Sequence, residues 1–320
     1  MEPVVIGRSD LGEAYGAAPS GVGTGLLDPA GAIPPRGRVL MGAGQPVVFI
    51  VPLMAGDVIG VIAQIEAASG EPHDMFEWRV DYLDVLRGLS GEELSDQARE
   101  EISRSAAEIL DASDVPVLAT VRTAAQGGKA EVSTPVYGQI VELLAECGMD
   151  AVDVEMAPAA PTLTEKAHAA GAKVVMSFHD FEVTPESEIM RELLETMAAL
   201  GADLAKLAVL ANSERDALNV ELVQRWAAEY VSAPSIVLAM GEFGRQTRAT
   251  QPEDGGVASF VAVSGRESAP GQWGAQELAE KLGRSCGYLR LDCASVDQVS
   301  QRKDDEDPEN FNQSKRCGNP

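Results

Sequence analysis

The sequence lacks long hydrophobic runs. No apolar stretch approaches the roughly 20 residues that a bilayer-spanning helix requires. The N-terminus, MEPVVIGRSD, has neither a basic start nor an apolar stretch after it, as a secretory leader would. We therefore expect a soluble, unexported, cytoplasmic protein that has no membrane partner.

Basic residues and paired cysteines are also scarce. Asp and Glu number 50 against 25 Lys and Arg, which gives a formal net charge of −25. This balance argues against a nucleic-acid or anionic-membrane surface, so an anionic substrate must be met by local arginines. Cys147, Cys286, Cys293 and Cys317 lack the close paired spacing of a zinc or redox motif, and we interpret them as reduced thiols.

What the chain does contain is a regular alternation of strand and helix patterns. Helical spacing of apolar residues follows position 142 and recurs from 188 and from 213. Between such patterns lie eight short apolar, β-rich runs: 47–51, 76–80, 115–121, 151–155, 173–178, 204–209, 235–240 and 258–263. Eight repeats predict an α/β fold of the (β/α)8 TIM-barrel class. An open doubly wound sheet is the alternative, but VPLMAGDVIG after the first run lacks a dinucleotide or phosphate-loop pattern.

The composition divides the chain into three parts. Residues 1–36 are rich in Gly, Pro and Ala without a sustained period, which predicts a flexible N-terminal extension. Residues 296–320 are polar, charged and acidic, and we expect a disordered tail. The barrel should occupy 37–295, and RGRVLMGAGQPVVF at its start resembles a short hairpin that closes the barrel floor.

Lys206 and His179 are the sharpest candidates for chemistry. Lys206 is one of seven lysines and lies within the apolar run LAKLAV, where desolvation lowers the pKa of an amine. A neutral amine is what Schiff-base formation with a carbonyl requires, although a lysine paired with a carboxylate of a neighbouring strand is the structural alternative. His179, one of three histidines, follows the strand before and is suited to moving protons near neutral pH. Adjacent strands lie about 4.8 Å apart, so an amine and a base on them can meet one small substrate.

Other polar residues interrupt the predicted strands and their following loops. Glu77, Arg79 and Asp81 alternate and therefore share one face of a strand, either as a site or as a structural ion-pair network. Further ionisable residues in the strands are Arg122, Asp153 and Glu155. The last two loops carry candidates to grip a carboxylate and hydroxyl groups: Arg245, Arg248, Ser268 and Gln272.

Five segments in order resemble one known family, the type I 3-dehydroquinate dehydratases. They are FEWRVDYLD, TVRTAAQGG, MSFHDFEVTP, GADLAKLAV and SAPGQ, and the resemblance runs from about 37 to 284. HDFE-x-TP followed by GAD-x-AK is the specific part of the match. The resemblance implies a (β/α)8 barrel, a homodimer, and dehydration of 3-dehydroquinate to 3-dehydroshikimate in the shikimate pathway of aromatic amino acid biosynthesis, without metal or organic cofactor.

Roles follow from the resemblance residue by residue. It implies that Lys206 is the Schiff-base lysine and His179 the general acid and base, with Asp153 as a supporting acid. The positions implied to bind substrate are Glu77, Arg79, Arg122, Arg248, Ser268, Gln272, Met240 and Phe260, with Arg248 on the substrate carboxylate.

One position departs from the family pattern. A glutamate that orients the histidine is replaced here by Gln126, and an amide holds a ring tautomer without stabilising an imidazolium by charge. We therefore expect a lower pKa for His179. Two other functions stay open: a catalytically impaired homologue that binds dehydroquinate, and another Schiff-base barrel lyase such as a class I aldolase.

Overall fold

Eight parallel strands form the centre of the fold. The computed structural model of the protein describes residues 3–7, 37–89 and 91–284. Strands β3 to β9 pair in chain order, and β10 pairs with β3. A hydrogen bond from Val257 N, just before β10, to Ser235 O of β9 (3.2 Å) closes the barrel. Their bounds are β3 Val48–Leu53, β4 Met75–Arg79, β5 Val117–Thr120, β6 Ala151–Glu155, β7 Lys173–Asp180, β8 Leu204–Leu210, β9 Ser235–Met240 and β10 Ala258–Ala262. The predicted barrel class is confirmed, and each predicted strand lies within a few residues of an observed one.

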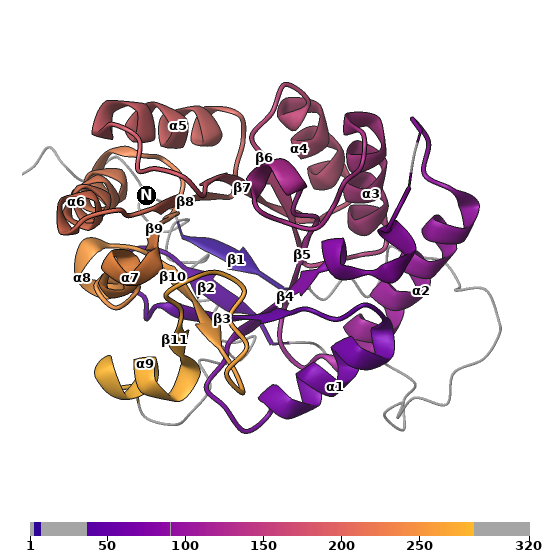
Figure 1. The fold of residues 1–320 in the computed structure, drawn as a ribbon, viewed down its shortest axis with the longest axis horizontal. Coiled ribbons are helices and arrows are strands. Elements are labelled where there is room, and N and C mark those ends of the chain that lie inside the picture. The colour runs from indigo at the N-terminus through magenta and orange to yellow at the C-terminus, as the bar shows by residue number, and fades with distance from the viewer. Residues whose placement is uncertain (1–2, 8–36, 90, 285–320) are drawn as a thin grey trace, which may run out of the picture.

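Helices surround the strands on the outside (Figure 1). The longer ones are α1 Val58–Ala68, α2 Asp96–Ala112, α3 Thr134–Glu146, α4 Ala160–Ala169, α5 Ser187–Ala199 and α6 Glu214–Tyr230. Shorter elements are α7 Gly241–Gly244, α8 Gln251–Asp254, α9 Ala275–Lys281, and the 3-10 turns η1 Val80–Tyr82, η2 Asp84–Leu86, η3 Ala124–Gln126 and η4 Arg245–Arg248. Several of these helices begin at an N-cap residue whose side chain accepts a hydrogen bond from a backbone N–H of the first turn, as Ser213 does at α6. None of the helices in the described ranges has the length and apolar character to cross a bilayer.

The hydrophobic residues separate into an outer layer and an inner layer. The outer layer, between strands and helices, includes Trp78, Val209 and Val223. The inner layer fills the barrel with residues such as Val175, Leu204 and Ile236. Both faces of each strand are thus buried, which is why the strands appear in the sequence as continuous apolar runs.

A two-stranded antiparallel sheet contributes to the inner layer. It pairs β1, Val4–Ile6, with β2, Val39–Met41, and both strands pack with inner-layer residues of the barrel (Figure 1, where both lie across the centre). An antiparallel strand pair is thus present as expected, but the expected partner is wrong: β2 pairs with residues 4–6, which lie in the predicted N-terminal extension, and not with the run at 47–51. The rest of that extension, residues 8–36, lies outside the described residues, as does the acidic tail 296–320.

A second short pairing matters for the site. β11, Trp273–Gly274, adds parallel to the end of β10 and positions the loop 263–272.

Cys147 is a free thiol, as expected of a reduced cysteine, and burial raises its pKa. The other three cysteines lie outside the described ranges.

Candidate active site

A pocket opens at the carboxyl ends of the barrel strands, where barrel enzymes place their chemistry. Its empty space, including the part open to solvent, measures about 490 Å³, enough for a small ring-shaped substrate. Of the residues that the family resemblance and its one departure single out, all but Asp153 line it: Lys206, His179, Glu77, Arg79, Arg122, Gln126, Met240, Arg248, Phe260, Ser268 and Gln272. The sequence motifs, which lie far apart in the chain, therefore converge on one cavity.

Lys206 lies on the apolar interior of the barrel. Its side chain is 7% exposed, and Nζ is 4.0 Å from the centre of the Phe260 ring. Glu77 Oε1 lies 3.5 Å and Asp153 Oδ2 3.8 Å from Nζ. The alternative of a lysine paired with a carboxylate is therefore represented only by these two long ion pairs. Burial lowers the pKa of Lys206; the two carboxylates raise it and two arginines lower it, and the balance falls below the ordinary value.

His179 stands one layer above the lysine on the adjacent strand. In the β7–β8 register Lys206 pairs with Ser177 and His179 with Ala208, so the two functional side chains are offset by two residues, about 7 Å along the strand. Burial, followed by the positive charges of Arg122, Lys206 and Arg79, places the pKa of His179 well below its usual value. The imidazole is therefore neutral at neutral pH.

Gln126 fixes which imidazole nitrogen carries the proton. Its Oε1 accepts from the backbone N–H of His179 (2.9 Å) and lies 3.2 Å from Nδ1. Because the backbone can only donate, this amide atom is the oxygen, and Nδ1 must then be the donor. Nε2 is left unprotonated, which is the form that a general base requires.

Arg122 is the centre of a buried charge network behind the lysine. Its guanidinium donates to Asp153 (2.7 Å), Glu155 (2.9 Å) and Ser177 (2.9 Å), and Ser177 Oγ donates to Asp153 (2.6 Å). Burial lowers the pKa of Arg122, but Asp153, Glu155 and Glu77 more than offset this and raise it above its ordinary value. The network holds Asp153 in place beside Lys206.

Arg248 is the one predicted cation left without a carboxylate partner. It is 2% exposed, Nε is buried without a hydrogen-bond partner, and no ion pair joins it to another residue within the described ranges. Burial lowers the pKa of Arg248 to about 10, against a small opposing effect of Glu267. An unpaired buried guanidinium is costly, and this one lines the pocket, where it is free to pair with an anion.

The loop after β10 forms one wall of the pocket with Ser268 and Gln272. Gln272 Oε1 accepts from Ser268 N (2.8 Å) and its Nε2 donates to Ser268 Oγ (2.8 Å). The loop is tied to the preceding one because Gly241 N donates to Pro270 O (3.2 Å) and Gly271, at φ +81°, would place a Cβ 2.5 Å from Gly241 O. Only a glycine at 271 permits this approach.

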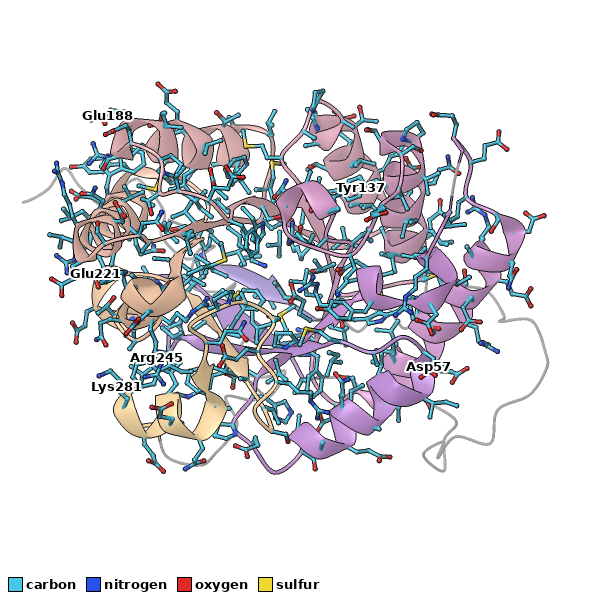
Figure 2. All side chains as sticks on the ribbon, viewed as in Figure 1. Asp57, Tyr137, Glu188, Glu221, Arg245 and Lys281 are labelled. Atoms are coloured by element: carbon cyan, nitrogen blue, oxygen red, sulfur yellow. The ribbon has the colours of Figure 1, made fainter. Side chains whose placement is uncertain are left out.

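One candidate lies elsewhere. Arg245 pairs with Glu277 (2.7 Å) and stacks on the Trp273 ring at 3.7 Å, so the expectation that it grips a carboxylate in the pocket is wrong. Lys281 approaches the same ring at 5.4 Å, and Figure 2 shows Arg245 and Lys281 side by side at the outer edge of the barrel.

The sequence analysis missed other residues. Phe181 lines the pocket, is stacked on the His179 ring (centroids 6.4 Å, interplanar 18°), and lies against Gly127, where a Cβ would be 2.3 Å from its ring. Its position two residues after the histidine was an available signal. Ser177, two residues before the histidine on the same strand face, was another.

Among the described residues, no group of three or more His, Cys, Asp or Glu side chains is arranged to hold a metal ion.

Comparisons with known proteins point to one family. A family model described as type I 3-dehydroquinase matches residues 49–285. The 3-dehydroquinate dehydratase of Klebsiella pneumoniae (strain 342) is 33% identical over 238 residues, covering 72% of this chain and 90% of that protein. The one of Listeria monocytogenes (strain HCC23) is 34% identical over 249 residues, covering 77% and 94%. A crystal structure of the Clostridium difficile type I enzyme with covalent modified comenic acid superimposes with a TM-score of 0.69 at 27% identity, covering 77% and 94%.

Proposed function

Because the chain belongs to the type I 3-dehydroquinase family and is therefore a hydro-lyase, a 3-dehydroquinate dehydratase, we propose that it acts through a Schiff base on Lys206 with His179 as general acid and base. The observation that carries the proposal is the buried amine of Lys206, whose pKa is lowered by the apolar interior of the barrel. It faces a pocket that also holds an unpaired guanidinium and a neutral imidazole.

The lysine supplies the electron sink. In its neutral form Nζ attacks the substrate ketone, and loss of water gives an iminium that acidifies the adjacent carbon. The neutral amine carries no charge, but the iminium formed from it is a cation. Glu77 and Asp153, 3.5 and 3.8 Å from Nζ, then stabilise this positive charge.

The histidine moves the protons. Nε2, free because Nδ1 donates to Gln126, takes the proton from the acidified carbon and the enamine forms. The same proton then goes to the hydroxyl that leaves as water, and hydrolysis of the conjugated iminium releases 3-dehydroshikimate and free Lys206. The water lost on iminium formation is taken up again in this hydrolysis, so the net products are 3-dehydroshikimate and the one water formed from the leaving hydroxyl, and both Lys206 and His179 are regenerated.

The remaining pocket residues bind and orient the substrate. Arg248 takes the carboxylate in a two-pronged pair, since it is the pocket cation that forms no ion pair with any described residue. Ser268 and Gln272 offer polar groups from the loop after β10, while Arg79, Arg122 and Glu77 face the ring from the opposite strands. Met240 and Phe260 supply the apolar walls. Family membership supports the further proposal of a cytoplasmic homodimer acting in the shikimate pathway.

Gln126 is the reason to consider a second function. An amide beside the histidine gives no charge support to an imidazolium, so a homologue that binds dehydroquinate with impaired turnover is the alternative. An aldolase is less favoured, because the unpaired arginine suits a carboxylate on a compact ring and no phosphate-binding motif is recognisable in the sequence.

Turnover separates these functions. The conjugated product absorbs in the ultraviolet, so the purified protein with 3-dehydroquinate should show a steady rise in absorbance. Lys206→Met should abolish it. Lys173→Met is the matched control, because Lys173 starts the neighbouring strand and pairs with Asp203 (2.8 Å) at the opposite end of the barrel. Tight binding without turnover in the unmodified protein would favour the impaired homologue.

A further inference from the structure

Asp81 is a buried carboxylate next to the pocket to which the mechanism above gives no role. It is 3% exposed and lies in η1, directly after β4. Its two oxygens accept a two-pronged pair from Arg79, Oδ1 from Nε and Oδ2 from the terminal nitrogen, both at 2.8 Å. Arg79 in turn lines the pocket, so Asp81 sets the orientation of a pocket cation without reaching the pocket itself.

The same Oδ2 also accepts from a second element. Lys129 N donates to it at 3.0 Å. Lys129 belongs to the loop 123–130 after β5, the loop that presents Gln126 to His179. On the other side of this loop Thr123 is held by Glu155 through backbone and hydroxyl bonds of 2.9 and 2.6 Å.

Tyr82 reinforces the link between Arg79 and this loop. Its ring lies 5.2 Å from the Arg79 guanidinium and 5.5 Å from Lys129 Nζ, so it contacts cations from both elements. One carboxylate and one aromatic ring therefore connect the substrate-facing arginine to the loop that orients the proposed base.

We infer that Asp81 is a positioning residue that holds Arg79 toward the substrate and, through Lys129, holds the Gln126 loop against His179. The inference rests on the proposed dehydration. It adds that substrate binding and orientation of the base share one anchor, although they are carried by different strands.

Substitution can separate the two contacts of Asp81, the paired hydrogen bonds from Arg79 and the single hydrogen bond from Lys129 N. In Asp81→Asn the amide oxygen is best placed at Oδ2, where it satisfies both Lys129 N and the terminal nitrogen of Arg79. The amide NH2 then confronts the Nε–H of Arg79, donor against donor, so Arg79 loses its fixed orientation while the loop stays anchored. Asp81→Ala removes both anchors.

Asp74 provides a matched control at the opposite end of the barrel. It is also 3% exposed, accepts a two-pronged pair from Arg284 (2.9 and 3.0 Å), and accepts a backbone N–H, from Phe49 (2.7 Å). Asp74→Asn and Asp74→Ala therefore impose the same local chemistry far from the pocket. They should lower the unfolding temperature and leave kcat and KM near those of the unmodified protein.

The test is steady-state kinetics of the four variants by the ultraviolet assay, with thermal unfolding alongside. Loss of a charge-assisted hydrogen bond predicts that Asp81→Asn raises KM by about tenfold to a hundredfold with little change in kcat. Asp81→Ala should raise KM similarly and also lower kcat, because the Gln126 loop is released.

An Asp81→Asn protein with the same KM as its Asp74→Asn counterpart would overturn the inference. So would an Asp81→Ala protein whose kcat matches that of Asp81→Asn. If Asp81→Ala does not fold, the Asn pair still decides on Arg79. Failure of the proposed function itself is distinguishable, because the unmodified protein would then show no turnover at all.

Discussion

Gln126→Glu is the substitution that most directly probes how the proposed base is tuned. It replaces a neutral amide with a carboxylate of the same shape, and the new oxygen can still accept from His179 N and Nδ1, now at 2.9 and 3.2 Å. The neutral form of the imidazole keeps both hydrogen bonds. The imidazolium gains an adjacent negative charge that the unmodified protein does not provide.

Coulomb's law sets the size of the effect. At 3.2 Å the attraction is about 1 kcal/mol in a medium like water and about 5 kcal/mol at an effective dielectric constant of 20. The half-buried pocket mouth lies between these limits, so we expect about 2 kcal/mol or more in favour of the imidazolium. The pKa of His179, well below its usual value in the unmodified protein, should rise accordingly.

The assay is kcat as a function of pH. In the covalent intermediate the lysine no longer titrates as a free amine, so the acid limb of kcat belongs to His179. In Gln126→Glu this limb should move to higher pH by at least about one unit. Gln139→Glu is the control, since it adds the same charge at a residue whose amide holds Leu94 and Glu92 outside the pocket. An acid limb that stays in place, or moves to lower pH, would refute the assignment of the base and its partner.

Three further substitutions test other parts of the site. Arg248→Gln should raise KM by about a hundredfold or more, since removing one partner of a buried charge pair costs about 2–5 kcal/mol; an unchanged KM would place the carboxylate elsewhere. His179→Asn tests the lowered pKa of His179 through urea unfolding at several pH values. Below about pH 6.5 the unfolded histidine binds a proton that the native one does not. The unmodified protein should therefore lose up to about 1.4 kcal/mol of stability per pH unit on acidification. The asparagine variant should lack this part of the slope, and equal slopes would contradict the lowered pKa. Gly127→Ala should lower kcat because its Cβ displaces Phe181 from His179, whereas Gly171→Ala, at φ +86° with open space around it, should lose only about 1–2 kcal/mol of stability and no activity.

The barrel was predictable because its signal is local. Strands such as Ala151–Glu155 and Ser235–Met240 are buried on both faces, and their apolar runs mark them in the sequence. The pairing of Val4–Ile6 with Val39–Met41 was not predictable, because three residues carry no period and their partner lies more than 30 positions away. A short strand of this kind is defined by the barrel interior it covers.

The site was predictable where a polar residue interrupts an apolar strand. Lys206 and His179 stood out for that reason. Composition and spacing alone do not separate Arg245 from Arg248, and only the resemblance singles out Arg248. The fold gives the physical difference: Arg245 reaches Glu277 outside the barrel, whereas Arg248 is buried in the pocket and forms no ion pair with the described residues. The hydrogen bonds that Asp81 accepts from Arg79 and from Lys129 N connect the end of β4 to the loop after β5, so no sequence pattern marks them.

The central claim is that Lys206 forms the covalent intermediate, and the most direct measurement is borohydride trapping during turnover. The protein is incubated with 3-dehydroquinate and sodium borohydride, digested, and analysed by mass spectrometry. We predict that a reduced substrate adduct forms on the peptide that contains Lys206, that activity is lost in step with it, and that the other lysines stay unmodified. A protein that turns over substrate while Lys206 remains unmodified would contradict the mechanism.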